Sequence, residues 1–189
     1  ILSDNTWKLI LQILKKLKYS LILLNKSECV AIPTETVYGL AGNAYSNEAV
    51  KKIFKLKNRS SINPLIIHYK KLKDIKNDVI YNSSLIKLYK AFCPGPITFV
   101  LKKKPKTALS SIATAGKKTV AVRFPSHKVA QELLKILNYP LAAPSANIST
   151  KISPISREDV IEEFGKKIKF ILNGGRCKIG LESTIISLI

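Results

Sequence analysis

Polar side chains gather directly after apolar runs at several places in this sequence. Residues 33–40 (Pro-Thr-Glu-Thr-Val-Tyr-Gly-Leu) place two threonine hydroxyls, a carboxylate and a phenol within one turn. Residues 143–149 (Ala-Pro-Ser-Ala-Asn-Ile-Ser) separate short hydroxyl and amide groups with alanines, which suits hydrogen bonding to a nucleotide. Because α/β folds place ligand sites where strands end, both segments are candidate binding loops. Ordinary surface turns have a similar composition, and this alternative stays open.

Lys57 and Arg59 stand two residues apart where a predicted helix ends. Together they could clamp a phosphate chain, because lysine supplies a compact charge and arginine a planar five-donor fork. Cations that only face the negative end of a helix dipole would give the same pattern. Arg59 is the more informative of the two, since only four of the 32 basic residues are arginines.

Several common catalytic motifs do not occur in the sequence. It contains no P-loop, no Gly-x-Gly-x-x-Gly, no His-Glu-x-x-His and no Gly-x-Ser-x-Gly. Only His68 and His127 could assist a serine nucleophile, and no pattern of stacking aromatics indicates an RNA-recognition module. Three widely spaced cysteines without a Cys-x-x-Cys pair fit a reducing, cytoplasmic setting and predict no metal site.

The formal net charge is +20 at pH 7, and 28 of the positive charges are lysines. Such a charge attracts polyanions, either nucleic acid or nucleotides. A lysine-rich solvated surface without a particular partner is the alternative. The 46% hydrophobic content excludes a disordered basic tail, and no stretch of 18 apolar residues predicts a membrane span.

Helix and strand patterns alternate and predict one mixed α/β domain over residues 1–189. Helices are expected over residues 4–18, 47–57 (with Asn47 as N-cap), 84–92, 126–137 and 156–164. Strands are expected over residues 29–33, 65–68, 97–101, 119–123, 141–143, 168–172 and 184–188. Residues 102–118 are expected to form a mobile loop, and Ile1, which is not methionine, indicates that the native start lies upstream.

Seven short motifs stand in a fixed order along the chain. They are Pro33–Leu40, Lys57-x-Arg59 with Pro64-Leu65, Pro94-Gly95-Pro96-x-Thr98, Val122-Arg123-x-Pro125-x-His127, Ala143-Pro144-Ser145-Ala146-Asn147, Ser153-Pro154 and Gly180-x-Glu182-Ser183-Thr184. Together they resemble the YrdC-like domain of threonylcarbamoyl-AMP synthases, the TsaC family, over nearly the whole chain. The family usually continues past the last strand with an Arg-Pro-Gly-like element, so the native C-terminal end is also expected to lie beyond Ile189.

The resemblance implies a twisted mixed sheet with a large concave, basic cavity, and it implies a reaction. L-Threonine and bicarbonate, as CO2, give N-carboxy-threonine, which attacks the α-phosphate of ATP and releases pyrophosphate. The product, threonylcarbamoyl-AMP, serves other proteins, a threonylcarbamoyl transferase complex that modifies an adenosine of tRNA. A need for Mg²⁺ belongs to the same expectation, whereas weak RNA binding is expected from the lysine charge alone. This nucleotidyl transfer needs no nucleophilic side chain.

The resemblance also assigns site residues. The residues implied in catalysis and ATP binding are Lys57, Arg59, Ser145 and Asn147, with Asn63, Thr119 and Ser153 as further ATP contacts. Those implied in threonine binding are Thr34, Thr36, His68, Arg123, Ala143 and Ser183. Arg123 would grip the carboxylate of the amino acid. Ser60 and Thr150 depart from the family pattern, which commonly has proline and Ser-Gly there.

Two other functions remain open from the sequence. One is a carbamoyl-adenylate-forming relative of the kind found within hydrogenase-maturation proteins, which are much longer chains with acylphosphatase and zinc-finger segments. The other is a double-stranded RNA-binding module, for which the charge of +20 is the only support.

Overall fold

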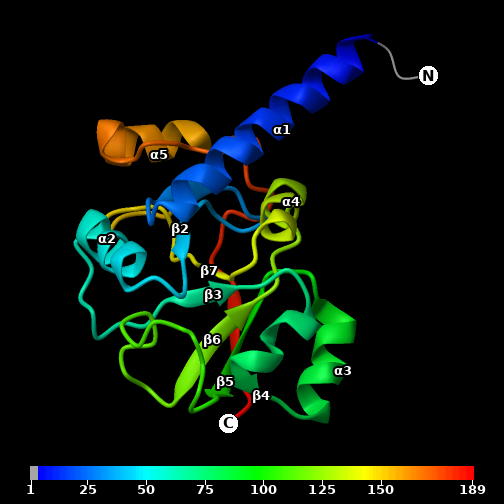
Figure 1. The fold of residues 1–189 in the computed structure, drawn as a ribbon, viewed down its shortest axis with the longest axis vertical. Coiled ribbons are helices and arrows are strands. Elements are labelled where there is room, and N and C mark those ends of the chain that lie inside the picture. The colour runs from blue at the N-terminus through cyan, green and yellow to red at the C-terminus, as the bar shows by residue number, and fades with distance from the viewer. Residues whose placement is uncertain (1–3) are drawn as a thin grey trace.

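The computed structural model describes residues 4–189, which form an α/β fold around an open, twisted mixed sheet (Figure 1). The strands are β1 (Val30–Ile32), β2 (Gly39–Asn43), β3 (Ile66–His68), β4 (Val79–Ile80), β5 (Ile97–Lys103), β6 (Thr119–Arg123), β7 (Leu141–Ala142) and β8 (Thr184–Ser187). Their order in the sheet is β1-β2-β7-β3-β6-β5-β4, and β8 pairs with β5. The β3–β6 and β5–β8 pairs are parallel and the others antiparallel, so the predicted mixed sheet is confirmed.

The helices cover the sheet, and their lengths follow from local signals. They are α1 (Asp4–Asn25), α2 (Asn47–Lys57), α3 (Ser83–Phe92), α4 (Lys128–Ile136) and α5 (Arg157–Phe164), with 3-10 turns η1 (Leu72–Asn77) and η2 (Gly165–Lys167). A capping box starts α5, because Ser156 Oγ accepts from Asp159 N at 3.1 Å. The N-cap of α2 is Ser46 and not the predicted Asn47, since Ser46 Oγ accepts from Ala49 N.

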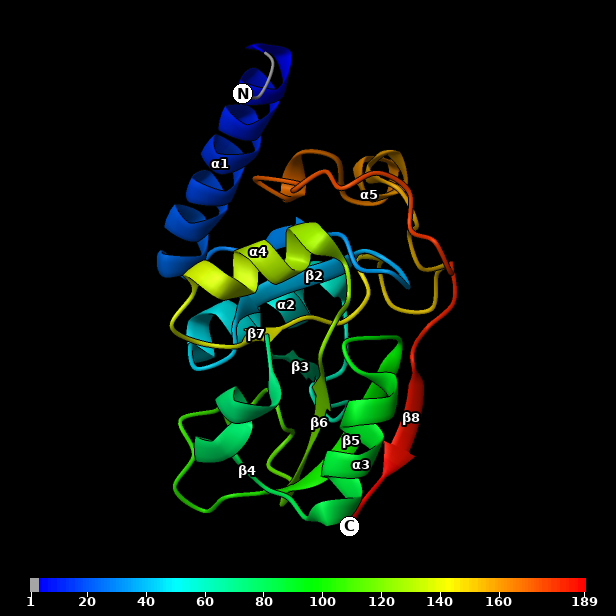
Figure 2. The ribbon, with the colours of Figure 1, turned by 90° about the vertical axis from the view of Figure 1, so that its right-hand side faces the viewer.

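Helix α1 is longer than the predicted 4–18 and only its second half is packed. Figures 1 and 2 show its N-terminal half extending away from the sheet. Trp7, Leu11 and Leu14 lie on one apolar face and are each about half exposed, whereas Leu17 and Leu24 are buried. The apolar face is therefore packed only toward the C-terminal end of the helix. No helix within residues 4–189 is long and apolar enough to cross a membrane.

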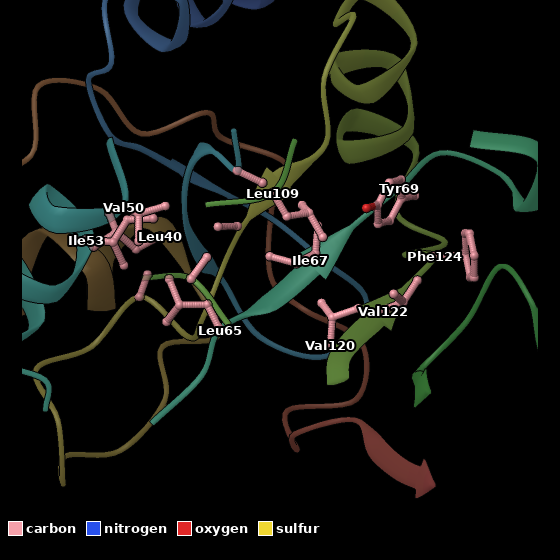
Figure 3. Close-up of a cluster of buried hydrophobic side chains, with 14 of the residues drawn as sticks. Leu40, Val50, Ile53, Leu65, Ile67, Tyr69, Leu109, Val120, Val122 and Phe124 are labelled. Carbon is pink, nitrogen blue, oxygen red and sulfur yellow. The ribbon is translucent and has the colours of Figure 1, made fainter. Parts of the chain in front are cut away.

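Two hydrophobic clusters hold the fold together. The larger lies around β3 and β6 and includes Ile67, Val122 and Phe124 (Figure 3). The smaller joins the end of α1 to α4 and to the first strands, with Leu24 and Leu133 fully buried. Burial of such side chains is the main favourable contribution to folding, and here it fixes the strands that carry the polar residues below.

Some predicted elements differ from those observed. Strand β2 was expected to belong to a polar turn, and β4 and η1 were not expected at all. Residues 168–172 form only a single bridge, Ile171 beside Ala31, in place of a strand. The expected loop 102–118 begins as the end of β5, and its centre is packed, since Leu109 and Ala113 are buried and Leu65 N donates to Ala113 O. Strand β4 has only two residues, which is too short for a periodic pattern to be detected in a sequence.

Candidate functional site

The two polar loops singled out in the sequence lie side by side. The loop after β1 is bonded to the loop after β7: Leu40 N donates to Pro144 O at 2.8 Å and Ala146 N donates to Tyr38 O at 2.7 Å. Gly39 and Ser145 form an isolated antiparallel bridge between the same loops. Main-chain hydrogen bonds therefore fix the position of Ser145 relative to residues 33–38.

The C-terminal motifs close the other side of the loop after β1. Ile179 N donates to Glu35 O and Gly180 N to Thr36 O, both at 3.0 Å, while Tyr38 N donates to Pro154 O at 2.8 Å. Four of the seven sequence motifs thus meet around residues 33–38, although they are spread over 150 positions of the chain. The fold therefore brings these four motifs together, although they are far apart in the sequence.

Three neighbouring strands place a histidine, an arginine and a threonine next to one another. His68 on β3 is paired in register with Arg123 on β6, which is paired in turn with Thr98 on β5. Directly paired residues point to the same face of a sheet, so these side chains are neighbours. Thr98 Oγ1 lies 2.7 Å from Ser183 Oγ, just before β8. All four side chains are buried.

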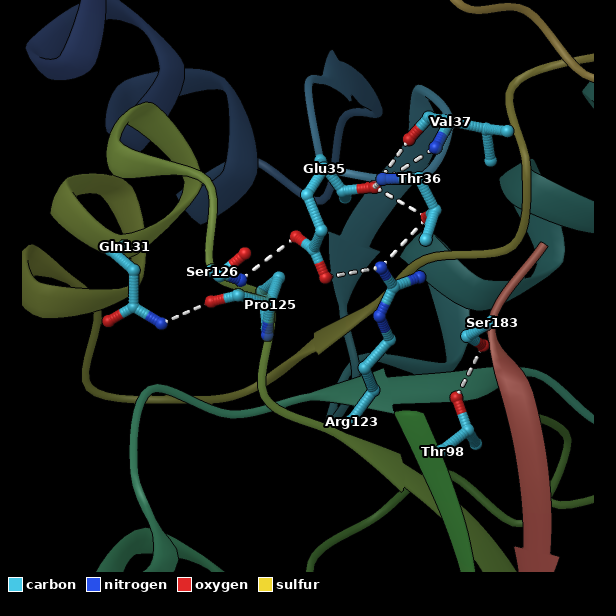
Figure 4. Close-up of polar contacts among 10 residues, drawn as sticks. Glu35, Thr36, Val37, Thr98, Arg123, Pro125, Ser126, Gln131 and Ser183 are labelled. Atoms are coloured by element: carbon cyan, nitrogen blue, oxygen red, sulfur yellow. Dashed lines mark hydrogen bonds and ion pairs between the residues drawn. The ribbon is translucent and has the colours of Figure 1, made fainter. Parts of the chain in front are cut away.

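A buried ion pair, Glu35 with Arg123, lies at the centre of this cluster (Figure 4). Arg123 Nη2 donates to Glu35 Oε1 at 2.8 Å, and Ser126 N donates to Glu35 Oε2 at 2.9 Å. Burial acts to raise the pKa of Glu35, but the charge of Arg123 and the hydrogen bonds from Arg123 and Ser126 hold it below the usual value. Glu35 is the functional side chain that sequence reasoning missed. The one available signal was a carboxylate between two threonines in a loop after a buried strand.

Two threonines extend this pair into a directed chain of hydrogen bonds. Arg123 Nη2 also donates to Thr36 Oγ1 at 2.8 Å. Thr34 Oγ1 donates to Val37 O at 2.6 Å, so its proton is already used. The 2.9 Å contact between the two hydroxyls must then be Thr36 donating to Thr34. Thr34 and Thr36 therefore orient Arg123 from one side while Glu35 orients it from another.

Two nitrogens in this cluster are buried without a hydrogen-bond partner among the residues the structure describes. They are His68 Nδ1 and Arg123 Nε. Buried polar atoms are nearly always satisfied, because an unmade hydrogen bond inside a protein costs about 1–3 kcal/mol. Both atoms are covered by neighbouring protein atoms, and they lie on paired residues of adjacent strands.

The buried state of His68 predicts a loss of stability in acid. Burial, followed by the charge of Arg123, lowers the pKa of His68 to about 3. The unfolded chain binds this proton below its ordinary pKa, whereas the folded chain does not until the pH approaches 3. The free energy of unfolding should therefore fall as the pH drops below about 6.5, by about 2 kcal/mol at pH 5 from this residue alone.

Urea unfolding of the wild type and of His68→Asn at pH 7 and pH 5 measures this contribution. The asparagine variant should show the smaller difference between the two pH values. His127→Asn is the matched control, because His127 is only half-buried. An identical pH dependence in the wild type and His68→Asn would contradict the assignment.

The amine of Lys57 points into the loop after β7. Its Nζ donates to Ser145 O at 2.6 Å and to Asn147 Oδ1 at 3.2 Å, and it also donates to Asn147 O. Lys57 is only 1% exposed, and burial, with the charge of Arg59 second, lowers its pKa to about 8. All three ammonium protons thus have acceptors within the protein. Lys57 holds the segment that carries Ser145 and Asn147.

Arg59 is the more accessible cation of the Lys57-x-Arg59 motif. It is half-buried, and its Nε and Nη2 donate to Asn63 O and Pro64 O, both at a long 3.3 Å. Burial lowers its pKa, but an arginine remains charged at all ordinary pH values. Weak contacts to two carbonyls leave this guanidinium able to turn toward a stronger anionic partner.

The remaining predicted residues are less closely gathered. Ser153 Oγ donates to Glu182 Oε1 at 2.7 Å and borders a hollow of about 660 Å³. Three carboxylates and one lysine line that hollow, so the expected large basic cavity is not confirmed there. Ala143 follows β7 directly and is buried. Its N donates to Ile66 O, which places it beside β3, the strand that carries His68. Thr119 is the first residue of β6 and lies on the same face of the sheet as Arg123, about 13 Å from it along the strand.

Comparisons with known proteins show what this chain is similar to. The family model for Sua5, YciO and YrdC, described as telomere recombination, matches residues 22–189. Threonylcarbamoyl-AMP synthase from Pyrococcus abyssi is 43% identical over 176 residues, which are 92% of this chain and 51% of that protein. Its counterpart from Bacillus subtilis is 45% identical over 168 residues, 87% of this chain and 48% of that protein.

A solved structure gives the same result. The crystal structure of P. abyssi Sua5 complexed with L-threonine matches with a TM-score of 0.87 and 43% identity, over 91% of this chain and 50% of that one. The chain thus spans about half the length of the curated relatives it matches.

Proposed function

Since the chain belongs to the Sua5, YciO and YrdC family, we propose that it makes threonylcarbamoyl-AMP from L-threonine, bicarbonate and ATP. The observation that carries this proposal is the Arg123 guanidinium, which Glu35 and Thr36 hold in a fixed orientation beside His68 and Thr98. The carboxylate of an amino-acid ligand would pair with the guanidinium donors that Glu35 and Thr36 leave free. A relative with 43% identity has been crystallised with L-threonine, which supports the same choice of ligand.

In this proposal Arg123 binds the threonine carboxylate. Glu35 and Thr36 already hold one terminal nitrogen of the guanidinium, so its remaining donors are presented in a fixed direction. A planar fork held in this way recognises a carboxylate with little loss of side-chain entropy. The side chains of Thr34, His68 and Ser183 and the backbone at Ala143 are proposed to complete the pocket.

The nucleotide is proposed to lie next to the loop after β7. Ser145 and Asn147 would contact it from that loop, Arg59 would neutralise the triphosphate, and Asn63, Thr119 and Ser153 would add contacts. Lys57 would hold this loop in place through its hydrogen bonds to Ser145 and Asn147, and it would also add a positive charge near the nucleotide. Preorganised cationic groups of this kind stabilise the charge that develops in phosphoryl transfer.

The proposed reaction balances without a side-chain nucleophile. The threonine amine attacks CO2, forms an N–C bond and loses a proton. An oxygen of the resulting carbamate attacks the α-phosphorus of ATP, and the bond to the leaving pyrophosphate breaks. Within the described residues no cluster of His, Cys, Asp and Glu side chains forms a metal cage. Mg²⁺ usually reaches such enzymes bound to the substrate phosphates, and we propose that it does so here.

Omitting one substrate at a time from a pyrophosphate-release assay tests the proposal. Release should need threonine, bicarbonate and ATP together, and Arg59→Ala should lower the rate by about 100-fold, because a positioned charge on the triphosphate is lost. Arg157→Ala, at an exposed arginine of α5, is the matched control and should not change it. Release without threonine would contradict the proposal. Activity with carbamoyl phosphate in place of threonine and bicarbonate would favour the carbamoyl-adenylate alternative.

The product would be used by a threonylcarbamoyl transferase complex that modifies tRNA, and this use places the protein in the cytoplasm. Calorimetry of threonine binding, with and without ATP, is a second test. Threonine should bind more tightly when ATP is present, if both ligands share the loops after β1 and β7.

A further inference from the structure

A second hollow lies away from the loops that form the candidate site. It is a cleft of about 480 Å³ between residues 69–77 and residues 134–140, and we call it the lysine cleft. Its lining residues are Tyr45, Tyr69, Lys70, Lys71, Lys73, Asp74, Lys76, Asn77, Leu134, Lys135, Leu137, Asn138, Tyr139 and Pro140. Five lysines therefore face one carboxylate across a concave surface.

The position of the lysine cleft separates it from the Arg123 cluster. Tyr69 directly follows His68 of β3, and successive side chains of an extended chain point to opposite faces. Figure 2 shows the yellow connection from α4 to β7, which borders the cleft, on one side of the molecule and β8 on the other. The two sites can therefore hold different ligands at the same time.

The positive charge of the cleft is not balanced within the protein. Asp74 Oδ2 accepts from Lys71 N at 3.1 Å and so serves to cap the turn η1. Among the described residues Lys70, Lys71, Lys73 and Lys76 have no acidic side chain within 4.0 Å of their amines. The fifth, Lys135, is 3.8 Å from Glu132 on the exposed face of α4.

The lysines also lie close enough to repel one another. The charge of Lys73 is the main cause that lowers the pKa of Lys71 below its usual value. Like charges held together are unfavourable unless an anion neutralises them, and a multivalent anion does so with the smallest loss of its own freedom. The arrangement therefore favours a ligand with several linked negative charges over a single anion.

Hydrogen bonds fix the floor of the cleft. Tyr45 Oη and Tyr69 Oη both donate to Asp78 Oδ2, at 2.9 and 2.8 Å, and Thr107 Oγ1 donates to Asp78 Oδ1. Asp78 is 1% exposed, so its carboxylate does not touch a ligand in the cleft, although its charge remains. A ligand would meet two tyrosine rings below and ammonium groups at the sides. The five lysines outnumber Asp74 and Asp78, so the net charge around the cleft stays positive.

We propose that the lysine cleft binds chains of linked phosphate groups. Its lysines are point charges without a fork, so they recognise the spacing and density of phosphates and not a base or a planar carboxylate. Two sources carry this chemistry, a free polyphosphate and the phosphodiester backbone of a single-stranded RNA. The proposal does not depend on the threonine chemistry of the other site.

The test compares two triple variants with the same loss of charge. Lys71→Ala/Lys73→Ala/Lys76→Ala removes the wall of the cleft, and Lys15→Ala/Lys16→Ala/Lys18→Ala removes three exposed lysines of α1. The probes are sodium tripolyphosphate, measured by calorimetry, and a fluorescent single-stranded RNA of ten nucleotides, measured by anisotropy. All proteins carry Arg59→Ala, so that the proposed triphosphate contact of the candidate site does not contribute.

We expect the cleft variant to bind at least one probe about tenfold or more weakly than its parent at low salt, and the α1 variant to bind as the parent does. For RNA, a plot of the logarithm of the association constant against the logarithm of the salt concentration has a negative slope. This slope should be about 2 less negative in the cleft variant, because three phosphate contacts are lost. Loss for RNA alone identifies the backbone as the source, and loss for tripolyphosphate identifies the free anion. Equal weakening in both variants, or no binding that depends on the cleft, would overturn the proposal.

Discussion

Replacing Arg123 by lysine is expected to reduce threonine-dependent activity and to destabilise the fold. Lysine cannot donate to Glu35 and Thr36 from one nitrogen and still offer a second nitrogen to a ligand carboxylate. The value of kcat/KM for threonine should fall by about 100-fold, because lysine keeps the charge but loses charge-assisted hydrogen bonds that contribute about 1.5–3 kcal/mol. Pyrophosphate release at varied threonine measures this, with Arg157→Lys on the surface as the control.

A second substitution in the Glu35–Arg123 ion pair separates the loss of stability from the loss of function. Arg123→Met alone leaves the carboxylate of Glu35 buried without its cation and should reduce the free energy of unfolding by about 3–5 kcal/mol. Adding Glu35→Met removes that unpaired charge and should restore most of the stability, because well-packed apolar groups often replace a buried ion pair without cost. Activity should stay lost. A double variant that regained threonine-dependent release would contradict the role proposed for Arg123.

Replacing Lys57 by methionine is the second large change. The variant keeps the length of the side chain but leaves the carbonyls of Ser145 and Asn147 without their donor. We expect the free energy of unfolding to fall by about 3 kcal/mol, since buried acceptors are left unsatisfied. Activity should fall by about 1000-fold, because the loop that carries Ser145 and Asn147 loses its fixed position. Urea unfolding and pyrophosphate release measure the two effects.

The same helix supplies the control for this change. Lys55 lies in the last turn of α2, two residues before Lys57, and its side chain is exposed. Lys55→Met removes the same charge from the same helix end but no buried hydrogen bond, so stability and activity should hardly change. If Lys57→Met behaved as Lys55→Met does, the loop would not depend on this ammonium. A rise in the Michaelis constant for ATP larger than that for threonine would support the assignment of the loop to the nucleotide.

The sequence alone predicted the elements with strong local signals. The apolar faces of α2 and α3, the start of α5 at Ser156 and the strands β3, β5 and β6 were recognisable from local patterns. It did not predict β2, because Gly39 and Gly42 gave a turn-like composition to a strand. Gly42 is needed there for packing, since a Cβ would lie 3.1 Å from Ile53 Cδ1 of α2 and 3.3 Å from the Cβ of Ala49. No local pattern reports a close approach by a distant helix.

The sequence by itself also determined which kinds of side chain the site contains: the hydroxyls of residues 34 and 36, the two cations of the Lys57 motif, and Arg123 as one of four arginines. Only the tertiary structure decided what these groups do for one another. Arg123 meets Glu35 across 88 positions of the chain, and Lys57 meets Asn147 across 90. Periodicity and capping signals extend over a few residues, because they arise from contacts within one helix or strand. Contacts over about 90 positions depend on the order of strands in the sheet, with β3 beside β6 and β7, and this order is set by packing of the whole core.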